Sequence, residues 1–165
     1  MRKTTAALIT AATTALATGA GLATASASPA APASSGTEHF YLMTTSGTSN
    51  RSSLIAEGVF TAAGVDISTG PSTDTVQLPG GTFKINHPGG NGNPTVNPAT
   101  CFVTYTGTAK FTLSGGTGKY KGLTGSGEAV ITIVAIAARS HGACSENTNP
   151  LAWHQTITGT AHVHL

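Results

Sequence analysis

A glycine-rich stretch at residues 111–133, FTLSGGTGKYKGLTGSGEAVITI, sets the strictest limits on the fold of this protein. Up to the first glycine of its loop, Gly115, small or apolar residues alternate with polar ones, which is the two-residue period of a strand with one face in a core. The residues on the apolar face are Gly107, Ala109, Phe111 and Leu113. The glycines that follow allow positive φ angles and close backbone approach. The stretch therefore predicts a strand, a shaped loop and a second strand.

The second strand is an apolar run, AVITIVAI at residues 129–136. Because β-branched residues dominate it and polar residues hardly interrupt it, it predicts a strand covered on both faces. The clearest alternation lies at residues 152–165. There Trp153, Ile157, Ala161, Val163 and Leu165 fall on one face, and histidines and threonines fall on the other.

Further strands are predicted at residues 37–45, 54–67, 74–78 and 82–87, with a hairpin at Pro79-Gly80-Gly81. Glycines inside residues 54–67, and Gly107 later, indicate bulges or tight bends. Residues 88–98 and 139–150 have the composition of polar loops. Helical periodicity is absent after residue 27, so the chain predicts an all-β fold. We expect a closed or nearly closed antiparallel barrel of seven to eight strands.

The N-terminus has the organisation of a signal peptide. Arg2 and Lys3 precede an apolar stretch at residues 6–20, and an Ala-x-Ala cleavage site ends at Ala27. A transmembrane anchor is the alternative, but spanning needs about 20 apolar residues. We therefore expect a secreted protein without membrane insertion, in which residues 1–27 are the signal peptide, residues 28–36 a disordered lead-in and residues 37–165 a single β-barrel domain.

Charge and cysteine content narrow the functional classes. Two of the eight basic residues belong to the leader, so six remain against six acidic residues. No basic patch is left, which argues against nucleic acid as a partner. The only cysteines are Cys101 and Cys144. In an exported chain such a pair predicts a disulfide bond rather than a metal site or a reactive thiol.

Two sets of residues are candidates for site chemistry. Glu57 and Glu128 are carboxylates with apolar neighbours, and inside a barrel such a group acquires a raised pKa and can act as a general acid or base. The alternative for both is a structural or solvent-facing role. His154, His162 and His164 share one strand face and can bind a metal if a third ligand comes from a neighbouring strand. The alternative is a solvated polar face, and we predict no metal or cofactor.

The segment 114–127, SGGTGKYKGLTGSG, followed by an apolar strand, resembles the glycine loop of allene-oxide-cyclase-like and dirigent-like β-barrels. With DTVQLPGG at residues 74–81 and NPATCFVTYTGTAKFTL at residues 97–113, it is similar to a group of small exported actinobacterial proteins. The resemblance covers residues 54–165. It implies an eight-stranded antiparallel barrel of the calycin or allene-oxide-cyclase type with an apolar interior, and oligomers such as trimers.

The sequence is compatible with three functions. The first is a non-catalytic secreted barrel that binds an apolar small molecule or a surface partner, because an eight-stranded barrel has room for one small ligand. The second is an isomerase or cyclase of the allene-oxide-cyclase or dirigent type, which requires Glu57 or Glu128 to face an open interior. The third is a structural, envelope-associated protein whose barrel is a durable scaffold.

Overall fold

The computed structural model describes residues 35–145 and 147–165. The predicted signal peptide and most of the predicted lead-in lie outside the described residues. The first strand, β1, begins at Ser35, two residues before the predicted start of the domain. In the described part of the chain, no helix has the length and apolar character needed to cross a membrane.

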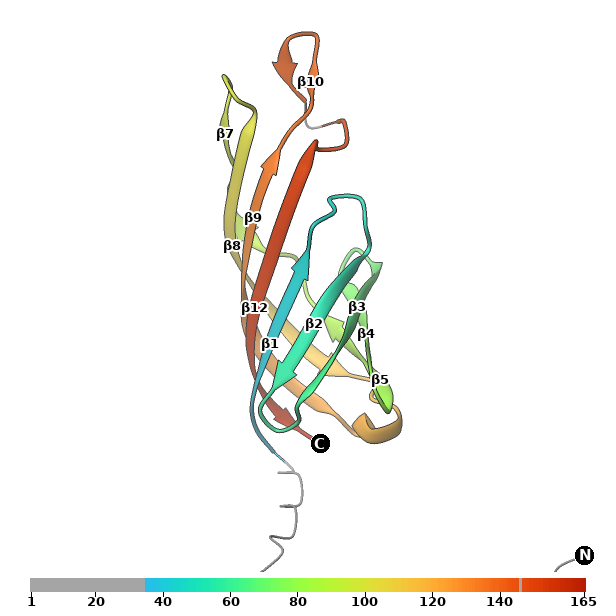
Figure 1. Cartoon of the computed structure of the whole chain (residues 1–165). Helices are drawn as coiled ribbons and strands as arrows, with labels where there is room; N and C mark the ends of the chain where they lie inside the picture. The colour runs from blue at the N-terminus through green and yellow to red at the C-terminus, as the bar shows by residue number, and fades with distance from the viewer. Residues whose placement is uncertain (1–34, 146) are drawn as a thin grey trace, which may run out of the picture. The chain divides into compact units, whose positions relative to one another are not determined.

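Eight antiparallel strands form a closed ring (Figure 1). They are β1 (Ser35–Thr44), β2 (Arg51–Glu57), β3 (Ala62–Gly70), β4 (Thr73–Leu78), β5 (Gly81–Asn86), β8 (Phe102–Ser114), β9 (Thr124–Ile136) and β12 (Ala152–His164). Neighbours pair in the order β5-β4-β3-β2-β1-β12-β9-β8. The ring closes where residues 84–86 of β5 pair with residues 112–114 of β8. The prediction of an all-β antiparallel barrel is confirmed.

Four short strands lie outside the ring. Strands β6 (Asn91–Gly92) and β7 (Thr95–Asn97) pair with β8, and β10 (Arg139–Ser140) pairs with β11 (Ala143–Cys144). In Figure 1, β7 and β10 lie at the upper end of the barrel, opposite the C-terminus, where β8, β9 and β12 extend past the other strands. The predicted loop at residues 88–98 therefore contains two short strands that pair with β8, and the predicted loop at residues 139–150 contains a short hairpin.

A disulfide bond joins Cys101 to Cys144, as the sequence predicts. Their Cα atoms are 5.3 Å apart. Cys101 lies between β7 and β8, and Cys144 ends the β10–β11 hairpin. The bond therefore ties together the extensions at the upper end and takes no part in closing the ring.

The predicted strand at residues 54–67 is wrong in one respect, since it divides into β2 and β3. The turn between them contains Gly58, whose φ is +149°. A Cβ at Gly58 would collide with the carbonyl oxygen of Thr37, so glycine lets the chain reverse against β1. A register shift falls between Ser68 and Gly70. The β8–β9 register, by contrast, runs past Gly107 without a break, so no bulge forms there.

The prediction that β9 is covered on both faces is also wrong, because the described residues leave its outer face exposed. Val130 is 44 % exposed and Ile136 is 40 % exposed, both on the outward face. A single closed sheet has only one interior, and only alternate residues of each strand reach it. Apolar composition alone does not reveal whether a second layer covers the outside.

The glycine loop closes the lower end of the barrel. After β8, the chain forms a single 3-10 turn, η1 (Gly118–Tyr120), whose Tyr120 ring packs inside. Its centroid lies 5.1 Å from that of Phe60 and 5.8 Å from that of Phe83. The backbone N–H of Lys119 donates to the carbonyl oxygen of Gly80 at 2.8 Å, which fastens the loop to the β4–β5 turn. Buried aromatic rings thus fill this end.

We expect Gly118→Ala to destabilise the fold. Gly118 has φ +57°, and a Cβ there would collide with the carbonyl oxygen of Gly80. Left-handed backbone and a displaced turn together cost about 2 kcal/mol of unfolding free energy. Urea unfolding measures this, with Gly70→Ala as the control, because nothing lies within 4 Å of a Cβ at Gly70. Equal stability of the two variants would show that the loop tolerates a side chain.

Candidate functional site

The upper half of the barrel holds a cavity of about 350 Å³. One side of its lining is apolar and comes from inward-facing residues of β1, β5, β8, β9 and β12. These residues are Phe40, Leu42, Ile85, Ala109, Phe111, Ala129, Ile131, Ile157 and Gly159. Small side chains on β8, β9 and β12 leave the space, and the rings of Phe40 and Phe111, 6.1 Å apart, lie among them. The volume falls at the small end of ligand-binding pockets.

The remaining wall of the cavity is polar and comes from consecutive strands. Ser52 on β2, Asp66 and Ser68 on β3, and Asp74 on β4 line it. Thr44, Ser49, Asn50, His87 and Gln155 add polar groups near the upper end. The cavity therefore has one apolar side and one side that can form hydrogen bonds, which is how ligand pockets usually fix the orientation of a bound molecule.

Asp66 is the most unusual group in this wall. It is 6 % exposed, and among the described residues its Oδ1 atom has no hydrogen-bond partner. Burial, together with the negative charge of Asp74, raises the pKa of the Asp66 carboxyl to about 7. Near neutral pH this carboxyl, which belongs to a residue lining the cavity, is therefore present in both its protonated and its ionised form.

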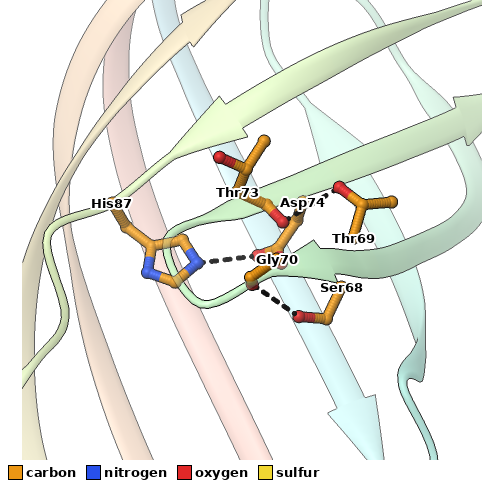
Figure 2. A network of polar contacts seen from close by, with 6 residues as sticks. All are labelled: Ser68, Thr69, Gly70, Thr73, Asp74 and His87. Atoms are coloured by element: carbon orange, nitrogen blue, oxygen red, sulfur yellow. Dashed lines mark hydrogen bonds and ion pairs between the residues drawn. The ribbon is translucent and has the colours of Figure 1, made fainter.

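A polar network orders the rim beside Asp66 (Figure 2). The His87 ring points toward Asp74, and its Nε2 lies 3.1 Å from the Asp74 Oδ2. In the β3–β4 turn, the hydroxyl of Thr69 donates to the carbonyl oxygen of Thr73 at 3.1 Å. The hydroxyl of Ser68 donates to the carbonyl oxygen of Gly70 at 3.4 Å. The contact with His87 fixes the carboxylate of Asp74 at the cavity edge, and the two hydroxyl bonds order the β3–β4 turn beside it.

A second buried carboxyl, Glu38, lies toward the other end of the barrel. It is fully buried on β1, one inward position below Phe40. Its Oε2 accepts a hydrogen bond from the backbone N–H of Phe60 at 3.1 Å, while Oε1 has no partner among the described residues. Burial raises the pKa of Glu38 to about 7, backbone hydrogen bonds from Phe60 and Val59 oppose the rise, and Glu57 adds to it. Glu38 is not among the residues lining the cavity.

The two carboxylates selected from the sequence lie elsewhere. Glu57 and Glu128 are both exposed at outward positions of β2 and β9. Glu128 borders an open external groove of about 780 Å³ beside the β5–β8 closure, opposite Lys110 in the strand register. The condition that one of these two faces the interior is therefore not met. The inward carboxyls are Glu38 and Asp66.

The three histidines selected from the sequence do lie on one outward face of β12. The rings of His162 and His164 are neighbours, with centroids 5.1 Å apart. His154 is eight residues earlier on the same strand, next to Val134 rather than to another ligand. Within residues 35–145 and 147–165, no group of three His, Cys, Asp or Glu residues could hold a metal ion.

Comparisons with known proteins do not extend these observations. No protein-family model, curated protein or solved structure matches the chain. The resemblance to allene-oxide-cyclase-like and dirigent-like barrels therefore stays a hypothesis based on the glycine loop. The cavity and the carboxyl groups inside the ring are therefore the features that bear on function.

Proposed function

We propose that this chain is a secreted barrel that binds one small, largely apolar molecule in the cavity at the upper end. The observation that carries the proposal is the composition of the interior. Large aromatic side chains fill the lower end, whereas small residues such as Ala109, Ala129 and Gly159 leave a cavity of about 350 Å³ above them. Stability alone favours a filled interior, because an empty cavity costs free energy.

Two features support export as part of this proposal. The N-terminal sequence has the three parts of a signal peptide. The Cys101–Cys144 bond belongs to a class of cross-link that persists in oxidising compartments. An extracellular binding protein fits both features, and mass measurement of the protein from its own culture fluid tests cleavage after Ala27.

A cavity-filling substitution tests the binding function. Ala109 lines the cavity, whereas the preceding residue on the same strand, Thr108, faces outward and is exposed. We expect Ala109→Phe to weaken binding of the neutral fluorescent probe N-phenyl-1-naphthylamine at least tenfold, and Thr108→Phe to leave it unchanged. Fluorescence titration measures both affinities. If wild-type protein does not bind the probe, or if both variants bind it equally, the cavity is not a ligand site.

Catalysis of proton transfer is the second candidate, and Asp66 is the observation that favours it. A carboxyl with a pKa of about 7 in a partly apolar cavity has the properties of a general acid or base. Its carboxylate can remove a carbon-bound proton, as in an isomerase or cyclase. The neutral probe 5-nitrobenzisoxazole reports this chemistry: as the base takes the ring C–H proton, the N–O bond breaks and a coloured phenolate forms.

For this candidate we expect the protein to open the ring of the probe faster than buffer does, at a rate that rises with pH through about 7. In Asp66→Asn this rate should fall at least tenfold. Glu128→Gln, which removes an exposed carboxylate, is the matched control and leaves the rate unchanged. No acceleration by wild-type protein, or equal acceleration by Asp66→Asn, would remove the enzymatic candidate without affecting the binding function.

A further inference from the structure

We propose that the natural ligand of the cavity carries a protonated amine, which binds at Asp66 while an apolar body occupies the opposite wall. This inference rests on the proposed binding function and specifies the chemical class of the ligand. It follows from three observations on the cavity: the charges that line it, the unpartnered oxygen of Asp66, and the separation of its polar and apolar walls.

The charges lining the cavity are unbalanced. Asp66 and Asp74 are the two acidic residues of the lining, and none of the described lining residues is Lys or Arg. Among the described lining residues, His87 alone carries a basic nitrogen, and its Nε2 already lies 3.1 Å from the Asp74 Oδ2. A ligand carboxylate, sulfate or phosphate would meet like charge and no cationic side chain. An ammonium group would meet opposite charge.

The buried oxygen of Asp66 calls for a hydrogen-bond donor. Its Oδ1 is buried and has no partner among the described residues, although it belongs to a residue that lines the cavity. A buried carboxyl that lacks hydrogen-bond partners is destabilising, so a ligand that supplies a donor to the Asp66 carboxyl from the cavity gains an interaction and lowers that cost. A protonated amine gives a charge-assisted hydrogen bond, which is about twice as strong as a neutral one.

The arrangement of the polar and apolar walls indicates the shape and polarity of the ligand beyond its amine. Asp66 on β3 pairs in register with Ser52 on β2, and both lie with Ser68 and Asp74 on the polar side of the cavity, which β2, β3 and β4 form. The apolar residues Phe111, Ala129 and Ile157 come from β8, β9 and β12, on the other side of the ring. A compact molecule with one cationic end and an apolar ring system or branched chain matches both sides at once.

Binding of an amine at this site is linked to protonation. The titratable groups that face the cavity are Asp66 on β3, Asp74 on β4 and His87 after β5, and the lining residues from β1, β2, β8, β9 and β12 include no further acid, histidine, lysine or arginine. Because burial holds the pKa of Asp66 near 7, the carboxylate that pairs with the amine forms only as the pH approaches neutrality. We expect amine affinity to rise from about pH 5.5 to about pH 8.

Three probes that share one apolar body test the inference. They are 1-naphthylmethylamine, 1-naphthalenemethanol and 1-naphthoic acid, each titrated into the disulfide-bonded mature protein at pH 8 by calorimetry or fluorescence. We expect the amine to bind about tenfold more tightly than the alcohol and the acid to bind more weakly than both. Equal affinities for amine and alcohol, or a preference for the acid, would overturn the inference. In that case binding of N-phenyl-1-naphthylamine would still support the proposed function.

A pair of variants assigns the preference to its residue. Asp66→Asn keeps the shape of the side chain and removes the charge, so we expect it to lose the amine preference and retain alcohol affinity within about threefold. Glu38→Gln makes the same kind of change at the residue that does not line the cavity, and we expect it to keep the preference. Retained alcohol binding shows that Asp66→Asn is folded. An undiminished amine preference in Asp66→Asn would refute the assignment to Asp66.

Discussion

The free energy of unfolding is expected to fall by several kcal/mol as the pH rises from about 5 to about 8, because the native state holds two carboxyls in their protonated form. Glu38 has a folded pKa of about 7 against an ordinary value of 4.5, and Asp66 one of about 7 against 3.8. Between these values the native state binds more protons than the unfolded state does. The contribution of these two groups to stability is therefore complete below about pH 4, declines as the pH rises through about 7 and is lost above about pH 8.

Glu38→Gln separates the contribution of Glu38 from that of Asp66. The amide oxygen can still accept the hydrogen bond from the Phe60 N–H, but the side chain no longer ionises. We expect this variant to match the wild type near pH 4 and to be about 3 kcal/mol more stable at pH 8, which corresponds to the rise in pKa. The slope that remains in the variant belongs to Asp66.

Urea denaturation from pH 4 to pH 9 measures both curves. Glu128→Gln is the control, because the side chain of Glu128 is exposed and its loss leaves the pH profile of the wild type in place. If the profiles of Glu38→Gln and the wild type run parallel, Glu38 does not titrate in this window. A stable ion pair or a bound cation at Glu38 would give that result.

Residue alternation predicted the ring well, because most inward positions of a closed sheet hold small or apolar residues. The C-terminal strand shows this directly. Ala161 and Val163 are buried, whereas the neighbouring His162 and His164 are exposed. The glycine loop was also recognised as a shaped connection. What the sequence did not show is that the loop folds back under the barrel and closes one end with Tyr120.

The buried carboxyls were missed for a physical reason that can be traced to single residues. Asp66 lies between Val65 and Ile67, and the expectation that apolar residues face the core places Asp66 outside. In the structure Asp66 faces inward and both apolar neighbours are only half-buried on the outer face. For Glu38 a signal was present, since it lies two residues before Phe40 and four before Leu42, both in the core. Because alternate residues of a strand face the same side, the buried Phe40 and Leu42 already place Glu38 on the inner face.

The second large effect concerns the disulfide bond. The residues it joins, Cys101 and Cys144, are 43 apart in sequence, and the segment between them contains the whole β8–η1–β9 hairpin. In the chain-entropy model, opening a loop of this length lowers the free energy of unfolding by about 4 kcal/mol, mainly by giving the unfolded chain more freedom. We expect a double variant, Cys101→Ala with Cys144→Ala, to lose about this amount. Denaturant unfolding measures the loss.

The position of the bond makes a sharper test possible. The ring closes through β5 and β8 at residues 84–86 and 112–114, far along β8 from Cys101, so the barrel and its cavity do not depend on the bond for their geometry. Below its unfolding transition, the double variant is expected to bind N-phenyl-1-naphthylamine as the wild type does. Reduction of the wild type with dithiothreitol should lower its stability to that of the double variant, whose own stability the reagent leaves unchanged. Loss of probe binding in a folded double variant would show instead that the tied extensions shape the cavity, since Gln155 and Gly90 at its rim belong to segments beside them.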